Sequence, residues 1–254
     1  MTRSLSTIAI LLVLVFCVSC AGRIKEVTER DKAASLNYYR LAYDFYRNRD
    51  VVQAIKSLRE AEKFDPNDVN VNNLYGLIYL GKKMFKESEA SFKKAVAAKE
   101  DFSDGYVGLS AVYMAQERWQ DAVDVLQKPS ADILYYRKDV VFDNMGWCYH
   151  MLGKEQEAIT SLKSALMENP SNCHVYYNLG LVYKDMGQYP ESIMSLKRGL
   201  KKCPTFFYGY YELALIAIKA RDNATAKDAL DKCVELGSNS VEAEECAKYL
   251  RLMK

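Results

Sequence analysis

Histidine is scarce in this sequence, and the residue patterns of common active sites are absent. The two histidines, His150 and His174, have no catalytic constellation around them. There is no glycine-rich phosphate loop, no G-x-S-x-G nucleophile elbow and no H-E-x-x-H zinc motif. No CxxC or mixed cysteine and histidine cluster has the spacing of metal ligands. We therefore expect a protein that is not an enzyme, with no catalytic residue, no metal, no other cofactor and no small-molecule substrate.

A strong charge of one sign is also missing. The 35 lysines and arginines are balanced by 33 aspartates and glutamates, which leaves a formal net charge of +2. Domains that bind nucleic acid concentrate basic residues on one face. The short pairs Lys82-Lys83 and Lys201-Lys202 are better interpreted as solvated helix ends. The charge balance therefore argues against a nucleic-acid partner.

The apolar run near the N-terminus is too short to cross a membrane. It extends from Ile8 to Val18, eleven residues, whereas a membrane-spanning helix needs about 20. Arg3 precedes the run, and small residues follow it. A short basic start, an apolar centre and a small-residue end predict a secretory signal peptide over residues 1–19.

The end of this segment, Val18-Ser19-Cys20-Ala21, resembles a bacterial lipobox. In a lipobox the cysteine is lipidated and becomes the first residue of the mature protein. The resemblance implies a lipid anchor on Cys20 and, because Ala21 is not aspartate, a place in the outer membrane of a Gram-negative bacterium, facing the periplasm. Residues 20–34 are mostly polar and would form a tether to the first helix. Since Cys17 stands where leucine is usual, an ordinary cleaved signal peptide is the alternative.

The remaining sequence is a repeat of 34 residues. Units begin at Ser35, Val69, Ser103, Asp139, Cys173 and Phe207; bulky residues recur at positions 4, 7, 11 and 24, and small residues at 8, 20 and 27. This pattern resembles the tetratricopeptide repeat. It implies an all-α, right-handed superhelical solenoid of six antiparallel helix pairs, each burying its apolar face against its neighbours. An amphipathic capping helix is expected over residues 241–253, with residues 35–254 forming a single domain.

One junction departs from the period. The third and fourth units start 36 residues apart, and Pro129 occupies a position where the repeat has a small helical residue. We expect residues 127–138 to form a looser, remodelled connection. A tolerated loop insertion and a hinge are both compatible with the sequence.

The first helices of such repeats line a concave surface, and positions 2, 5, 9, 12 and 13 of each unit face it. Many of these positions are apolar or tyrosine here, which suits an extended strand or an amphipathic helix of a protein partner. The predicted partner groove contains Leu36, Tyr39, Tyr43, Tyr46, Leu77, Leu80, Met114, Trp147, Tyr177, Leu181, Tyr208 and Tyr211. The alternative is that the superhelix or the chain's own ends cover these side chains.

Five cysteines lie beyond Cys20, and in an oxidising periplasm they can pair. Cys173 and Cys203 occupy positions 1 and 31 of one unit, at the same end of its helical hairpin. Cys233 and Cys246 lie on the last repeat and the capping helix, which must pack together. These two disulfides are favoured, with Cys148 left as a buried small residue; the alternative is that all five are packing residues.

A repeat-built outer-membrane lipoprotein of this size resembles the type IV pilus pilotins. The string Phe142-Asp143-Asn144-Met145-Gly146-Trp147-Cys148-Tyr149, which follows the lengthened junction, carries the likeness. The resemblance implies a monomeric scaffold that binds secretin subunits and promotes their localisation and multimerisation in the outer membrane. The alternatives are a lipoprotein of outer-membrane barrel assembly and an adaptor for peptidoglycan enzymes.

Overall fold

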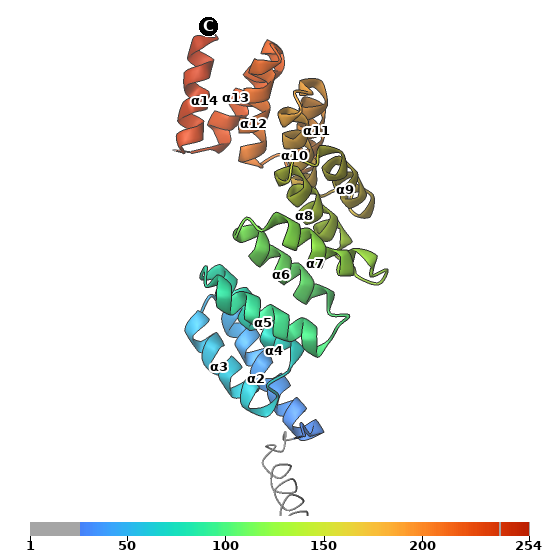
Figure 1. Cartoon of the computed structure of the whole chain (residues 1–254). Coiled ribbons are helices and arrows are strands. Elements are labelled where there is room, and N and C mark those ends of the chain that lie inside the picture. The colour runs from blue at the N-terminus through green and yellow to red at the C-terminus, as the bar shows by residue number, and fades with distance from the viewer. Residues whose placement is uncertain (1–25, 239, 254) are drawn as a thin grey trace, which may run out of the picture. The chain divides into compact units, whose positions relative to one another are not determined.

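A computed structural model describes residues 26–238 and 240–253, and within these ranges every regular element is an α-helix (Figure 1). The all-α fold of successive helix pairs is therefore confirmed. The helices are α2 (Glu29–Arg47), α3 (Val51–Phe64), α4 (Val69–Gly81), α5 (Phe85–Ala98), α6 (Ser103–Ala115), α7 (Trp119–Ala131), α8 (Lys138–Met151), α9 (Glu155–Glu168), α10 (Cys173–Asp185), α11 (Tyr189–Lys202), α12 (Phe207–Lys219), α13 (Asn223–Leu236) and α14 (Val241–Leu252). The predicted signal peptide and Cys20 lie outside the described residues.

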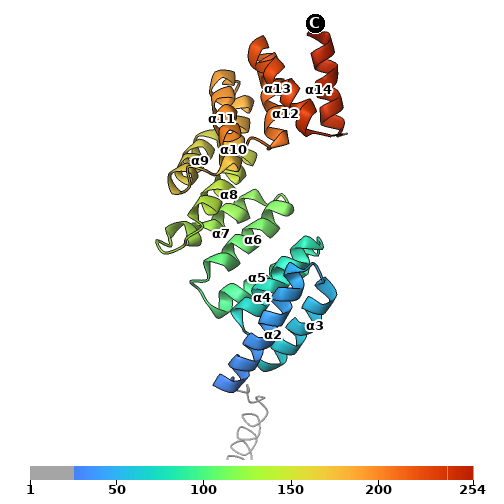
Figure 2. The same cartoon turned by 180° about the vertical axis from the view of Figure 1, so that it is seen from behind.

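The chain divides into two compact units. The first ends at Asp68 and contains α2 and α3, the first predicted repeat. The second begins at Val69 and contains the other five helix pairs and α14. Within the second unit each helix packs on the next along the chain, and α14 lies against α13 and α12 (Figure 2).

The first helix begins earlier than the repeat frame predicts. Residues 29–34, expected to belong to the tether, form the first turns of α2. Thr28 caps the helix by accepting a hydrogen bond from the Asp31 backbone N–H, while the Asp31 carboxylate accepts one from the Thr28 backbone N–H. This reciprocal capping satisfies two backbone donors that would otherwise lack partners, so the helix extends toward the N-terminus.

The turn inside each pair has the same backbone conformation in all six repeats. Position 15 has a positive φ each time, at Arg49, Lys83, Glu117, Gly153, Gly187 and Arg221. Only glycine adopts this conformation without steric cost, and two of the six repeats have it there. In the other four repeats a residue with a Cβ adopts the positive φ, because the two helices can pack against each other only with this turn.

The core of the second unit depends on close helix approach at glycines. The Phe92 ring is fully buried between α4 and α6. A Cβ added to Gly76 or to Gly108 would overlap this ring. The pair formed by α4 and α5 is further joined by the Ser88 hydroxyl, which donates to the Gly76 carbonyl over 2.7 Å. Phe92, the bulky residue at position 24, therefore fits because both neighbouring helices have a glycine where they face its ring.

We predict that Gly108→Ala destabilises the protein by about 1–3 kcal/mol, because the new methyl group must displace a buried aromatic ring. The free energy of unfolding in urea measures the effect. Gly81→Ala is the matched control, since a Cβ there meets no atom within 4 Å. Equal stability of the two variants would contradict this packing.

The junction around Pro129 differs from the expected loose connection. Helix α7 continues through Pro129 to Ala131, so the connection shrinks to residues 132–137. Proline removes one backbone donor, but the helix ends two residues later and the ring itself is buried. Of the described helices, none is long and apolar enough to span a bilayer.

Candidate functional site

In the first unit, the four predicted groove residues lie on α2 at helical spacing. Leu36 and Tyr43 are 37% and 43% exposed, and Tyr39 and Tyr46 are half-buried. The Tyr39 and Tyr43 ring centroids are 6.2 Å apart. Because residues three and four apart share one side of a helix, the four side chains form a continuous apolar strip. An aromatic strip of this kind suits apolar anchors of a protein partner.

In α4 and α6 of the second unit, the predicted residues have a different role. Leu77, Leu80 and Met114 are half-buried and pack against the core around Phe92. Their packing favours the alternative in which these side chains support the fold. On the same helix as the two leucines, Asn73 Oδ1 is buried and has no hydrogen-bond partner. A buried acceptor without a donor inside the protein is costly, and ordered water is the usual partner of such an atom.

In the middle of the second unit, a polar cluster joins the fourth and fifth repeats. Asp143 on α8 accepts a hydrogen bond from the Asn178 side-chain amide on α10 over 2.8 Å. Burial raises the pKa of Asp143 to about 6, against the opposing effects of Asn178 and His174. Trp147, a predicted groove residue, is half-buried, with its ring 5.5 Å from that of His150.

The raised pKa of Asp143 predicts a pH-dependent stability. The folded-state pKa lies above the ordinary value, so this carboxyl favours folding when protonated, below about pH 4, and that contribution is lost as the pH rises through about 6. Asp143→Asn should therefore raise the free energy of unfolding at pH 7.5 by about 2 kcal/mol. Urea denaturation from pH 4 to 8 measures it, and Asp228→Asn, at an exposed position on α13, is the control with the same change of charge. A pH dependence unchanged by Asp143→Asn would contradict the assignment.

Near the C-terminus the structure forms a pocket of about 270 Å³ between α10, α12 and α14. Buried Ile216 contributes to its apolar side, with Leu215 and Ile218 half-buried beside it. Its lining residues are Lys184, Glu212, Leu215, Ile216, Ile218, Lys219, Glu245 and Tyr249. Apolar side chains bordered by both signs of charge can hold an apolar anchor and orient polar atoms on either side of it.

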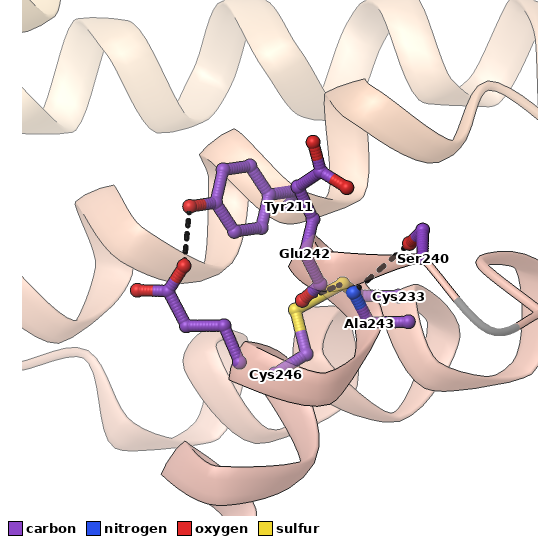
Figure 3. The surroundings of a disulfide bond; sticks show 7 residues. Tyr211, Cys233, Ser240, Glu242, Ala243 and Cys246 are labelled. Atoms are coloured by element: carbon purple, nitrogen blue, oxygen red, sulfur yellow. Dashed lines mark hydrogen bonds between the residues drawn. A yellow bond between two sulfur atoms is a disulfide. The ribbon is translucent and has the colours of Figure 1, made fainter.

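The two glutamates of the pocket, Glu212 and Glu245, already have partners. Lys184 Nζ lies 3.3 Å from Glu212 Oε2. The Tyr211 hydroxyl donates to Glu245 Oε2 over 2.8 Å, the dashed line at Tyr211 in Figure 3. Burial, and then the bond to Glu245, raise the pKa of Tyr211 to about 12, so its hydroxyl stays a hydrogen-bond donor at neutral pH. Within the described residues, no group of three or more potential ligands could hold a metal ion.

The two cysteine pairs favoured by the sequence are both bonded in the structure, as Cys173–Cys203 and Cys233–Cys246. The second joins α13 to α14 (Figure 3). Cys246 directly follows Glu245, which lines the pocket. Cys148 is free and buried, and burial raises the pKa of its thiol to about 12. Its thiol is therefore unreactive at neutral pH.

The remaining predicted groove residues divide into exposed and covered ones. Tyr208 is 52% exposed, whereas Tyr177 packs edge-on against Phe206. Leu181 is only 9% exposed, so it belongs to the core and offers a partner little surface. Sequence reasoning missed Glu245 and Tyr249, since it assigned α14 a capping role only. Their spacing of four residues is the signal that places both on one side of that helix.

Family models described as tetratricopeptide repeat or TPR repeat match residues 39–101, 148–187, 174–205 and 208–239. The matched segments lie in both units and follow the helix pairs described above. The chain is a tetratricopeptide-repeat protein. Proteins built from this repeat bind other proteins, which agrees with the apolar strip on α2 and with the pocket near the C-terminus.

Among known proteins, the repeat protein is similar to two type IV pilus proteins. It is 23% identical over 155 residues to the type IV pilus assembly protein PilF of Pseudomonas aeruginosa, across 60% of this chain and 61% of that protein, less than two thirds of its length. The structure of Pseudomonas aeruginosa PilF matches with a TM-score of 0.75 and 18% identity, covering 87% of this chain and 100% of that one. PilW, described as a widely conserved type IV pilus biogenesis factor, matches with a TM-score of 0.78 and 20% identity, covering 84% and 98%. At these identities the structural likeness shows a shared fold.

Proposed function

We propose that this tetratricopeptide-repeat protein is a scaffold of type IV pilus assembly that works as a pilotin, binding secretin subunits and promoting their multimerisation in the outer membrane. The observation that carries the proposal is the likeness to PilF: the fold matches over the whole solved PilF chain, and 23% sequence identity extends over 61% of the PilF sequence. The lipobox-like sequence around Cys20 supports an outer-membrane, periplasm-facing location.

The proposed mechanism has no covalent step. Lipid on Cys20 directs the protein to the outer membrane, and its apolar surfaces hold an apolar segment of a secretin subunit during transport. The strip on α2 and the pocket between α10, α12 and α14 each offer sites for such a segment. Affinity comes from removing apolar anchors from water, at about 25 cal/mol for each Å² buried. Delivery to one membrane then brings subunits together for assembly.

The proposed surface is tested by Tyr39→Ala combined with Tyr43→Ala. We expect the double variant to fold normally, because Tyr43 is 43% exposed, and to bind a purified secretin subunit about 30-fold more weakly. Truncating two aromatic anchors at an interface removes about 2 kcal/mol of binding free energy. Isothermal titration calorimetry with the full chain measures the affinity.

The control for this experiment is Val52→Ala, on the other helix of the same unit, where the side chain is 63% exposed. It should bind like the unchanged chain. Equal binding by the double variant would exclude the α2 strip. Specific capture of a barrel-assembly protein or a peptidoglycan enzyme, with no secretin, would favour one of the two alternative functions.

A further inference from the structure

The loop between α7 and α8, residues 132–137, is fixed by hydrogen bonds to helix α6. The Asp132 carboxylate accepts a 2.7 Å hydrogen bond from the Ser103 hydroxyl of α6, and one of 3.0 Å from the Leu134 backbone N–H. The Tyr135 hydroxyl donates to Asp104 of α6 over 2.7 Å, and its side chain is 8% exposed. Two anchor residues therefore fix the conformation of a loop that the sequence predicts to be loose.

Between and beyond these anchors, the loop exposes large apolar side chains. Ile133 is 86% exposed, Leu134 88% and Tyr136 82%. Among the described residues, no other large hydrophobic side chain is as exposed as any of these three. Exposing one such side chain is common, but three together on a fixed loop mark an interaction site.

Basic residues surround this apolar tip. Lys128 on the last turns of α7 is exposed, Arg137 closes the loop and Lys138 begins α8. Two acidic residues nearby already have partners, Asp132 with Ser103 and the part-exposed Asp104 with Tyr135 and Arg137. Aliphatic and tyrosine side chains flanked by lysine and arginine are the composition of segments that bind the interface of anionic membranes.

We propose that the loop of residues 132–137 inserts Ile133, Leu134 and Tyr136 into the interfacial layer of an anionic lipid bilayer, with Lys128, Arg137 and Lys138 against the headgroups. The inference goes beyond the proposed function and does not require lipid on Cys20. It assigns the second unit a membrane contact of its own, in addition to any N-terminal anchor.

The backbone of the loop favours lipid over strand addition to another protein. The Leu134 N–H is bonded to the Asp132 carboxylate, and the Tyr135 N–H to the Asp132 carbonyl. An added strand needs a run of free backbone donors and acceptors along its edge, and this turn already uses the backbone donors of Leu134 and Tyr135.

Binding to vesicles tests the proposal. The full chain would be incubated with vesicles of equal parts phosphatidylglycerol and phosphatidylethanolamine, and with vesicles of phosphatidylcholine alone. We expect Ile133→Ser combined with Leu134→Ser to weaken binding to the anionic vesicles roughly tenfold or more. Lys128→Gln should weaken binding less and reduce its dependence on salt. Val241→Ser with Leu252→Ser is the matched control, since these side chains are 78% and 73% exposed elsewhere.

A local probe separates loop insertion from N-terminal anchoring. Leu134→Cys, in a full chain that also carries Cys17→Ser and Cys20→Ser, accepts an environment-sensitive fluorophore because Cys148 is buried and the other four cysteines are bonded. A blue shift on anionic vesicles supports insertion. Emission unchanged on vesicles that carry the bound protein would overturn the proposal. So would equal vesicle binding by the double serine variant, or an effect of that variant confined to self-association of the chain.

Discussion

Deletion of the gene for this chain is expected to abolish detergent-resistant secretin multimers while secretin monomers remain. The physical reason is that, in the proposed mechanism, subunits reach the outer membrane and meet one another only when bound to the lipidated scaffold. Immunoblotting of membrane fractions without heat treatment measures multimer and monomer together. This is the largest effect predicted here, since it is a loss rather than a reduction.

Complementation sharpens this experiment. The unchanged chain should restore multimers in the outer membrane, and Cys20→Ser, which cannot be lipidated, should restore them poorly or in the wrong membrane. Normal multimers in the outer membrane of the deletion strain would contradict the pilotin function. That result would not contradict the repeat fold or the proposed membrane contact of residues 132–137, because both are inferred from other observations.

Reduction of the two disulfides is expected to lower the stability of the folded chain by about 3 kcal/mol for each bond. The bonds close segments with sequence separations of 30 and 13 residues, and each restricts the unfolded chain. A loss of about 3 kcal/mol corresponds to a fall in Tm of about 6–12 °C for each bond in a chain of this length, and so to about twice that when both bonds are reduced. Thermal unfolding followed by circular dichroism, with and without reductant, measures it.

The two bonds can be separated by substitution. Cys233→Ser with Cys246→Ser should loosen α14 in particular, because terminal helices of a repeat array are stabilised only by their neighbours. Loosening α14 also removes Glu245 and Tyr249 from the pocket. A chain lacking all four cysteines should not respond to reductant. A Tm unchanged by reductant in the natural chain would show that neither bond contributes.

The sequence predicted the repeat architecture well because its signals are local and recur. Helices α4, α6, α10 and α12 begin at the predicted residues, and α8 begins one residue early at Lys138. The early start of α2 was also visible in the sequence, as Thr28 followed by Asp31 three residues later, but it lies outside the repeat frame. The continuation of α7 through Pro129 could not be predicted from the sequence, because proline usually ends or kinks a helix.

The candidate site was harder to predict, because exposure depends on which neighbours cover a side chain. Leu181 and Tyr208 occupy surface positions of the same repeat frame, yet one is 9% exposed and the other 52%. The C-terminal pocket needs Glu245 and Tyr249 from a helix outside the repeat. The exposed loop tip depends on Tyr135 turning inward to Asp104, which leaves Ile133 and Leu134 in water. No periodic pattern encodes that contact.

Site-specific photo-crosslinking in cells tests the central claim, direct binding of a secretin subunit, most directly. A photoreactive phenylalanine analogue would replace Tyr43 on α2 or half-buried Leu215 in the C-terminal pocket, with Met167, 77% exposed on α9, as the control position. We predict adducts with a secretin subunit from at least one of the two sites and none from the control. Adducts with other envelope proteins and none with secretin, from both sites, would contradict the account.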